Sequence, residues 1–267
     1  MKIRCFVILM SLFMFVSCGE KRNNPLIQNL DKSWTVTTDT LNIKMQVDVP
    51  SVIQADMYEN GLIPHPYKSN VEPQLLWIPQ HEWVYSLDFR AEDYILREDV
   101  IELVFEGLDT YADVWFNGEK IIHSDNMFRT YSYDVKDLIK ENNKIKIKFY
   151  PFDKERDSLI ETYRLRFPEK YAVMRKAAYQ NGWDWAPRYM NMGIWQPVYI
   201  KAWTRSTICS ASVITKDIHD DKADLFFEAC INADVEHNIS LQLFQEDEKI
   251  LDQNINLTKG TNYYSFP

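Results

Sequence analysis

Alternation of apolar and polar residues is the feature that most limits the fold of this chain. From Trp83 to Phe89, aromatic or aliphatic side chains occupy every second position, and from Lys144 to Phe149 lysines alternate with Ile, Ile and Phe. Successive side chains of a strand point to opposite faces. This period of two therefore predicts strands with one buried and one solvated face.

Further short strands are predicted at residues 101–105, 112–116 and 130–135. The second of these ends at Asn117-Gly118, a strong hairpin signal because both residues tolerate a positive φ. Short, closely spaced strands of antiparallel pattern are typical of a β-sandwich or a jelly roll. We therefore expect an all-β fold.

Two segments interrupt the β pattern. Residues 51–61 predict a short helix that begins after Pro50 and ends at Asn60-Gly61. Residues 153–179 are highly charged, have a weak helical period and are interrupted by Pro168. We expect this second segment to cover one end of the sandwich.

After Trp203 the aromatic density falls, and alternating strands are predicted at residues 223–231 and 239–245. This pattern favours a second all-β unit of immunoglobulin-like type over residues 204–267. Such sandwiches usually need ~100 residues, so we expect this one to be incomplete.

The first residues are typical of a targeting signal. Lys2 and Arg4 precede a twelve-residue apolar run that is too short to span a bilayer, and the run ends just before Cys18. A bacterial lipoprotein signal at residues 1–17, lipidation of Cys18 and a linker at 18–30 follow as predictions. The chain would then be a cell-envelope lipoprotein, periplasmic or anchored at the outer membrane, and attached to the membrane through lipid alone. A plain secretory peptide is the alternative.

Charge and cysteine content narrow the classes of ligand. The chain has 30 basic and 39 acidic residues and no basic stripe, which argues against nucleic acid and favours a neutral ligand. The five histidines are scattered and no Cys/His cluster has metal-ligand spacing, so neither a metal site nor a cofactor is predicted. Cys209 and Cys230 could form a disulfide in an oxidising compartment or remain two buried free thiols.

The stretch from 181 to 200 reads NGWDWAPRYMNMGIWQPVYI and places Asp184 between Trp183 and Trp185. Spacing alone favours a structural carboxylate that caps the preceding segment or pairs with Arg175 or Arg188. Contact with a ligand is the other interpretation. The end of the stretch predicts a closing strand with two core aromatic residues, Trp195 and Tyr199.

Several motifs in a fixed order carry a family resemblance. They read VPSVIQADMYENGLIPHPY, WVYSLDF, FEGLDTYADVWFNG, NMFRTYSYDV and RKAAYQNGWDWAPRYMNMGIWQPVYI. Together they resemble the N-terminal sugar-binding domain of β-mannosidases of glycoside hydrolase family 2, over roughly residues 34–203. Ala186 stands where the family commonly has glycine, and HPYKSNVEP is a looser form of another family loop.

The resemblance implies a galactose-binding-like jelly roll over residues 31–203, followed by the incomplete immunoglobulin-like sandwich. It also implies that Trp183, Asp184 and Trp185 bind a β-mannoside or related neutral saccharide, in a site completed by a (β/α)₈ barrel. The family's catalytic glutamates lie in that barrel. This chain has no Asn-Glu pair of the kind that holds the acid/base. We therefore assign it no catalytic residue and expect it to be inactive alone.

Three interpretations of the whole chain remain. It could be the amino-terminal piece of a β-mannosidase, a free-standing carbohydrate-binding surface lipoprotein without catalysis, or a relic or scaffold without a ligand. An unfinished second sandwich would expose unpaired strand edges, which favours the first interpretation.

Overall fold

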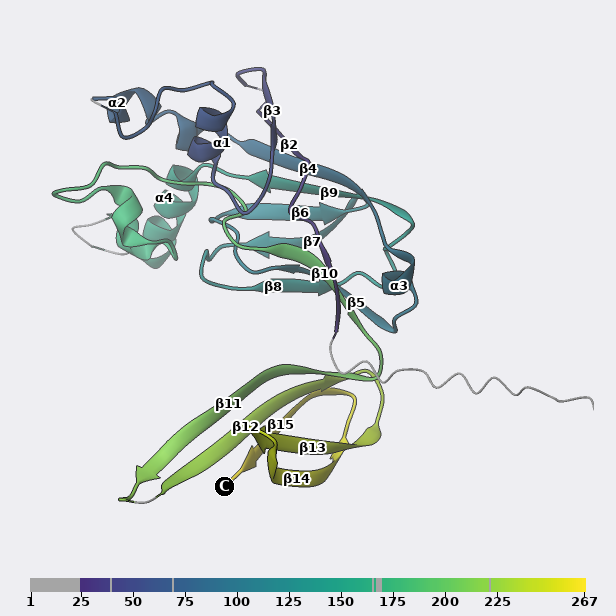
Figure 1. The fold of residues 1–267 in the computed structure, drawn as a ribbon. Coiled ribbons are helices and arrows are strands. Elements are labelled where there is room, and N and C mark those ends of the chain that lie inside the picture. Colours follow the sequence, from purple (N-terminus) through teal and green to yellow (C-terminus); the bar gives the residue numbers. More distant parts are fainter. Residues whose placement is uncertain (1–24, 39, 69, 165, 167–169, 221) are drawn as a thin grey trace, which may run out of the picture.

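The structure, a computed structural model, describes residues 25–267 except 39, 69, 165, 167–169 and 221. The predicted signal peptide at 1–17 and the predicted lipidation site Cys18 lie outside the described residues. The described chain is mostly β, with a jelly roll of two antiparallel sheets followed by a further β unit (Figure 1). This confirms the fold class predicted from the alternating pattern.

The larger sheet of the jelly roll has six strands in the order β3-β2-β4-β9-β6-β7. Their bounds are β2 Trp34–Thr38, β3 Ile43–Val47, β4 Trp83–Arg90, β6 Ala112–Phe116, β7 Glu119–Ser124 and β9 Asn142–Phe149. In β4 and β9, which pair antiparallel, the predicted alternation is present, with Tyr85 opposite Ile147 and both buried. Lys144 and Lys146 of β9 point outward and are exposed.

The smaller sheet has the order β1-β10-β5-β8. Its strands are β1 Leu26–Asn29, β5 Val100–Phe105, β8 Tyr131–Asp134 and β10 Val198–Trp203. Strand β1 pairs antiparallel with β10, with Leu26 opposite Ala202. The prediction of a linker over 18–30 is therefore wrong for residues 26–29, which belong to the jelly roll.

The closing strand β10 also corrects the expected roles of two aromatic residues. Trp195 precedes the strand, and Tyr199 lies on the face opposite its buried neighbours Val198 and Ile200. Both aromatic side chains are half-buried. The core between the two sheets is built instead around fully buried side chains that include Trp34, Trp83, Tyr85, Phe105 and Phe149.

Most helical segments gather at one end of the jelly roll, where Figure 1 shows α1, α2 and α4 together. The helices are α1 Ile53–Glu59, α2 Glu72–Leu75, α3 Asp93–Leu96 and α4 Phe152–Tyr163, with 3₁₀ turns η1 Ile78–Gln80, η2 Lys170–Val173 and η3 Ala178–Asn181. Helix α1 confirms the helix predicted at 51–61. Helix α4 forms the first part of the charged segment and ends at Arg164, which has a left-handed backbone conformation.

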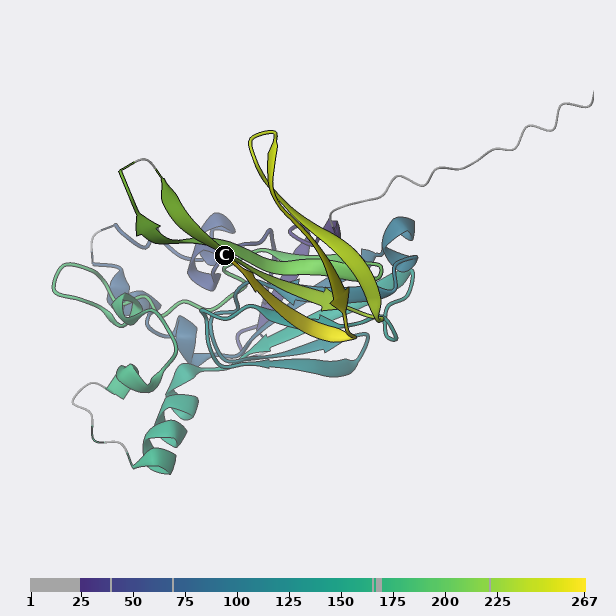
Figure 2. The same ribbon diagram turned by 90° about the horizontal axis from the view of Figure 1, so that it is seen from below.

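The second unit consists of a three-stranded sheet, β11-β12-β15, and the hairpin β13-β14. The bounds are β11 Ser206–Ile218, β12 Ala223–Ala233, β13 His237–Gln245, β14 Glu248–Leu257 and β15 Gly260–Phe266. Figure 2 shows the β11–β12 and β13–β14 hairpins diverging at their outer ends. The unit has a small buried core of Ala229, Ile231, Ala233, Leu241 and Leu257. A disulfide bond joins Cys209 to Cys230.

Candidate functional site

The Trp-Asp-Trp stretch forms a tight turn that we call the tip hairpin, residues 183–186. The amide of Trp183 donates to the carbonyl of Ala186 at 3.1 Å, and the amide of Ala186 donates back at 3.2 Å. Asp184 and Trp185 therefore occupy the two turn positions. The chain reaches and leaves the tip hairpin through two stems, residues 176–182 and 187–193.

Side chains of the tip hairpin are open to solvent. Trp183 is 65% exposed, Trp185 is 83% exposed, and Asp184 is also exposed. The Asp184 carboxylate makes no hydrogen bond or ion pair with any residue that the structure describes. Neither Arg175 nor Arg188 pairs with it. No described residue therefore occupies an acceptor position of this carboxylate.

Arg188 instead holds the second stem. Its guanidinium donates to the Tyr171 hydroxyl and lies 4.9 Å from the centroid of that ring. Its backbone amide donates to Oε1 of Glu72 at 3.1 Å. Arg175 is exposed, and its carbonyl accepts a hydrogen bond from the amide of Met127. Arg188 thus fixes the loop through its side chain, whereas Arg175 contributes its backbone carbonyl, and neither contacts Asp184.

A cleft of about 570 Å³ lies beside the tip hairpin, between α1, the loop at residues 65–67 and the two stems. Its aromatic lining consists of Tyr58, His65, Tyr67, Tyr179, Trp185 and Tyr189. Gln54, Gln180 and Asn191 add amide groups, and the described lining contains no Asp, Glu, Lys or Arg. Its volume lies within the ~300–1,000 Å³ of small-molecule sites, and aromatic walls with few polar groups are typical of them. The cleft suits a neutral ligand with apolar faces.

Gln54 contributes an unsatisfied polar atom to this region. Its side chain is only 5% exposed, and Nε2 donates to the carbonyl of Met190 at 2.9 Å. The other amide atom, Oε1, is buried and has no partner among the described residues. Buried acceptors are nearly always hydrogen-bonded. Gln54 Oε1 is therefore an exception inside the wall of the cleft, and it is not exposed to the cleft itself.

Asp56 fixes α1, and with it one wall of the cleft, to the sheet. It is 2% exposed and accepts hydrogen bonds from the hydroxyls of Ser51 and Tyr85, the latter at 3.0 Å. Burial raises the pKa of Asp56 to about 6, although the hydrogen bonds from Ser51 and Tyr85 oppose this rise. Burial, and then the nearby Asp56 charge, raise the pKa of Tyr85 well above its ordinary value.

Gly193, at the end of the second stem, lies against the same region. Its φ is +148°, and a Cβ atom there would lie 2.7 Å from the carbonyl oxygen of Ser51. Only glycine therefore allows the stem and the start of α1 to approach this closely.

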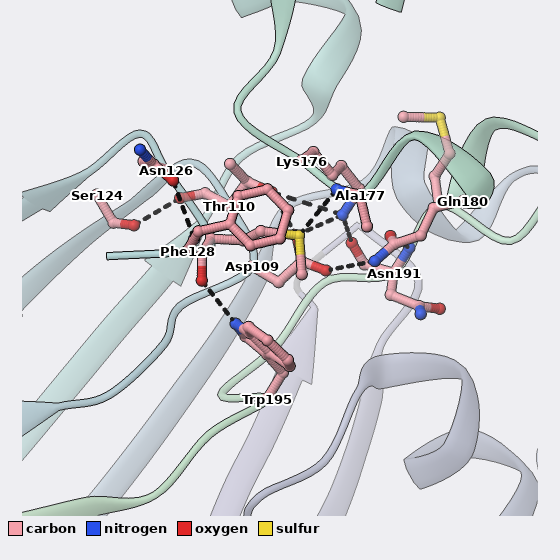
Figure 3. A network of polar contacts seen from close by, with 12 residues as sticks. Asp109, Thr110, Ser124, Asn126, Phe128, Lys176, Ala177, Gln180, Asn191 and Trp195 are labelled. Atoms are coloured by element: carbon pink, nitrogen blue, oxygen red, sulfur yellow. Dashed lines mark hydrogen bonds and ion pairs between the residues drawn. The ribbon is translucent and has the colours of Figure 1, made fainter. Parts of the chain in front are cut away.

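A buried ion pair lies under the stems (Figure 3). Lys176 and Asp109 have side chains that are 0% and 1% exposed. The ammonium group of Lys176 pairs with Oδ1 of Asp109, donates to the carbonyl of Asn191 at 2.7 Å, and lies 4.5 Å from the ring centroid of Phe152. Burial lowers the pKa of Lys176 to about 8, while the charge of Asp109 acts in the opposite direction.

Gln180 extends this network to the other oxygen of Asp109, to which its Nε2 donates at 3.1 Å. Its Oε1 accepts the backbone amide of Asn191 at 2.9 Å. Sequence reasoning missed Asp109, Lys176 and Gln180, although all three lie within the quoted motifs. The sequence offered one signal at Lys176, a charged residue among small and aromatic ones. No feature of the neighbouring sequence indicated that Asp109 is its partner.

Two other kinds of site find no support in the described part of the chain. No group of three or more His, Cys, Asp or Glu residues is placed there to hold a metal ion. Nor does any described helix have the length and apolar character needed to cross a membrane.

Comparisons with known proteins identify the family and the fold. Residues 34–196 match the family described as "Glycosyl hydrolase 2 galactose-binding domain-like". The β-mannosidase of Mus musculus is 29% identical over 188 residues, which are 66% of this chain and 21% of that protein. β-Mannosidase A of Emericella nidulans is 32% identical over 182 residues, which are 64% of this chain and 19% of that protein. The chain thus spans about a fifth of the length of these curated relatives.

Among solved structures, the β-D-mannosidase of Dictyoglomus thermophilum is similar to this chain with a TM-score of 0.78 and 27% identity. The similarity covers 91% of this chain and 31% of that structure. An exo-chitosanase of Amycolatopsis orientalis has the same fold, with a TM-score of 0.70 and 20% identity.

Proposed function

Because the chain belongs to the glycosyl hydrolase 2 galactose-binding domain-like family, we propose that it forms the amino-terminal, substrate-contacting part of a β-mannosidase. Its homology to the N-terminal region of β-mannosidases supports this proposal. The observation that carries it is the solvent-open tip hairpin, whose carboxylate has no described partner and whose Trp185 lines a neutral aromatic cleft.

The residue types of the tip hairpin suit a pyranose. A sugar ring has an apolar C–H face that can rest on an indole, which in this proposal is the exposed ring of Trp185 or Trp183. Its hydroxyls are donors, and the ionised carboxylate of Asp184 can accept two of them at once. Hydrogen bonds to a charged group contribute about 1.5–3 kcal/mol each.

Hydrolysis in this proposal needs groups from a second source. A retaining glycosidase uses two carboxyl groups about 5–5.5 Å apart, one as nucleophile and one as acid/base. The tip hairpin supplies a single carboxylate, which we assign to substrate binding. We assign the nucleophile and the acid/base to a (β/α)₈ barrel against which the tip hairpin would pack, so that hydrolysis takes place on terminal β-D-mannosyl residues.

A titration followed by NMR tests the binding role. Methyl β-D-mannoside should perturb the indole signals of Trp183 and Trp185. Asp184→Ala should weaken binding by about tenfold or more, because the loss of one charged hydrogen bond costs at least ~1.4 kcal/mol. Asp88→Ala, which removes an exposed carboxylate on β4, is the matched control and should bind as the unmodified chain does. Equal affinity of the Asp184 variant and the unmodified chain would refute the proposal.

A free-standing saccharide-binding protein without catalysis is the second candidate. It is favoured by one observation, that the described residues beside the tip hairpin form a cleft of about 570 Å³, within the ~300–1,000 Å³ of small-molecule sites. Affinity separates the two candidates. Half a site should bind the methyl mannoside only weakly, whereas a micromolar dissociation constant, with no hydrolysis of nitrophenyl β-mannoside, would favour the binding protein.

We further propose that the chain is a lipoprotein of the cell envelope, anchored at Cys18. This rests on the basic start, the short apolar run and the position of the cysteine. Incorporation of labelled palmitate should be lost in Cys18→Ala. Retained label in that variant would exclude lipidation at this residue.

A further inference from the structure

Both stems of the tip hairpin contact the same residue of the jelly roll, Asp109, although the second stem also has bonds to Ile53 and Gln54 of α1. From the first stem, Lys176 and Gln180 donate to its two carboxylate oxygens. From the second stem, Gly193 exchanges two backbone hydrogen bonds with Asp109, at 2.9 and 3.0 Å. Asp109 lies between β5 and β6 and is buried, with 1% of its surface exposed.

The stems are also tied to each other by the same side chains. Lys176 donates to the carbonyl of Asn191, and Gln180 accepts the amide of that residue. The described groups that face the Lys176 ammonium are the Asp109 carboxylate, the Thr110 hydroxyl, the Asn191 carbonyl and the Phe152 ring of α4. Figure 3 shows Lys176 and Gln180 together with Asp109 and Asn191.

A buried ion pair is a poor device for stability alone. Removal of two charges from water is costly, and well-packed apolar residues often replace such pairs without loss of stability. Directional hydrogen bonds do fix the relative positions of the segments that they join. Here the two stems and the loop that holds Asp109 meet at one buried ion pair. The tip hairpin that the stems carry is open to solvent.

We propose that Lys176 is a positioning residue, whose ammonium group joins the two stems to Asp109 and thereby sets where the tip hairpin presents Asp184 and Trp185. This inference rests on the proposed function for its effect on saccharide binding, but the placement of the stems is independent of any ligand. Small displacements of binding groups are costly to a site. If the two stems are held less firmly at Asp109, saccharide binding should therefore weaken, although no residue proposed to contact the saccharide has changed.

Hydrogen exchange of single amides in the full chain tests the placement. In Lys176→Met, the amides of Asn191 and Gly193 should exchange at least about tenfold faster, while amides in the paired strands β4 and β9 keep their protection. Ile147→Val is the matched control. It removes one methyl-sized group from the buried core at strand β9, outside both stems, and so lowers stability without altering the Lys176 contacts. Uniform acceleration in Lys176→Met, or none at either stem amide, would overturn the proposal.

The double variant Lys176→Met/Asp109→Asn separates positioning from stability. It removes both charges, so it should regain much of the urea resistance that Lys176→Met loses. Its affinity for methyl β-D-mannoside should nevertheless stay about tenfold below that of the unmodified chain. Recovery of affinity together with stability would show that Lys176 acts through stability alone, and would overturn the proposal.

The two proposals can fail separately. If Asp184→Ala binds the mannoside normally while Lys176→Met still frees the stem amides, the proposed function is wrong and the positioning role of Lys176 stands. If Asp184→Ala loses binding while Lys176→Met leaves the stem amides protected, the positioning role is wrong and the proposed function stands.

Discussion

Asp56 should make the jelly roll less stable at neutral pH than at mildly acidic pH. Burial raises its pKa from the ordinary value of 3.8 to about 6. Each unit of pKa corresponds to about 1.4 kcal/mol, so the ionised form should cost the folded state about 3 kcal/mol. Between these two pH values the folded protein holds a proton that the unfolded chain has lost. This contribution to stability is therefore complete below pH 3.8 and is lost as pH rises through about 6.

Asp56→Asn removes this dependence, because an amide cannot ionise. The difference in unfolding free energy, variant minus unmodified chain, should increase by roughly 2 kcal/mol between pH 4 and pH 7, because pH 4 already lies just above the pKa of the unfolded chain. A hydrogen-bond penalty from Ser51 and Tyr85, which now meet an amide, would shift both values by a similar amount and leave the difference unchanged.

Urea titrations followed by tryptophan fluorescence give the measurement. All eight tryptophans lie between Trp34 and Trp203, so the signal reports the jelly roll and not the second unit. Asp88→Asn, at an exposed position on β4, controls for the loss of a negative charge. A difference that stays constant from pH 4 to pH 7, or that decreases, would refute the argument that burial disfavours the ionised form of Asp56.

Three further predictions concern stability. The unmodified chain should gain stability relative to Lys176→Met as pH rises above about 8 in urea titrations, because the unfolded chain then holds a proton that folded Lys176 has lost. Gly107→Ala should lower the urea midpoint by the equivalent of ~1–3 kcal/mol, since its Cβ would lie 2.8 Å from Cγ of Gln196 and closer still to the Trp195 indole. Reduction of the Cys209–Cys230 disulfide, whose cysteines are 21 residues apart, should destabilise the second unit by ~3 kcal/mol, seen as a lower melting temperature by far-UV circular dichroism.

Elements that depend on neighbouring residues could be predicted from the sequence. The alternation in β4 and β9 needs only the period of two and one buried face, and both strands have the expected burial. The hairpin between β6 and β7 turns at Asn117 and Gly118, which both have positive φ as predicted. Helix α1 begins and ends near its predicted breakers.

Strand β1 was missed because its evidence is distant in the sequence. Four residues, LIQN, are too few for a reliable period, and they become a strand through pairing with β10, about 170 residues later. Trp195 was misplaced for a related reason. An aromatic residue in a strand-like context favours a core position, but here its indole donates to the carbonyl of Met127 and lies against Gly107. Both outcomes depend on which distant segments meet.

The two aspartates of the site show why its charges could not be assigned from local pattern. Asp109 lies in an ordinary-looking loop yet is buried, and its acceptors are used by Lys176 and Gln180, residues 67 and 71 positions away. Asp184 lies between two tryptophans, where a buried position could be expected, yet it is exposed and has no described partner. The stems are held at Asp109 without any contact from Asp184. Because no described residue uses the acceptors of the Asp184 carboxylate, position along the chain alone could not tell the buried aspartate from the exposed one.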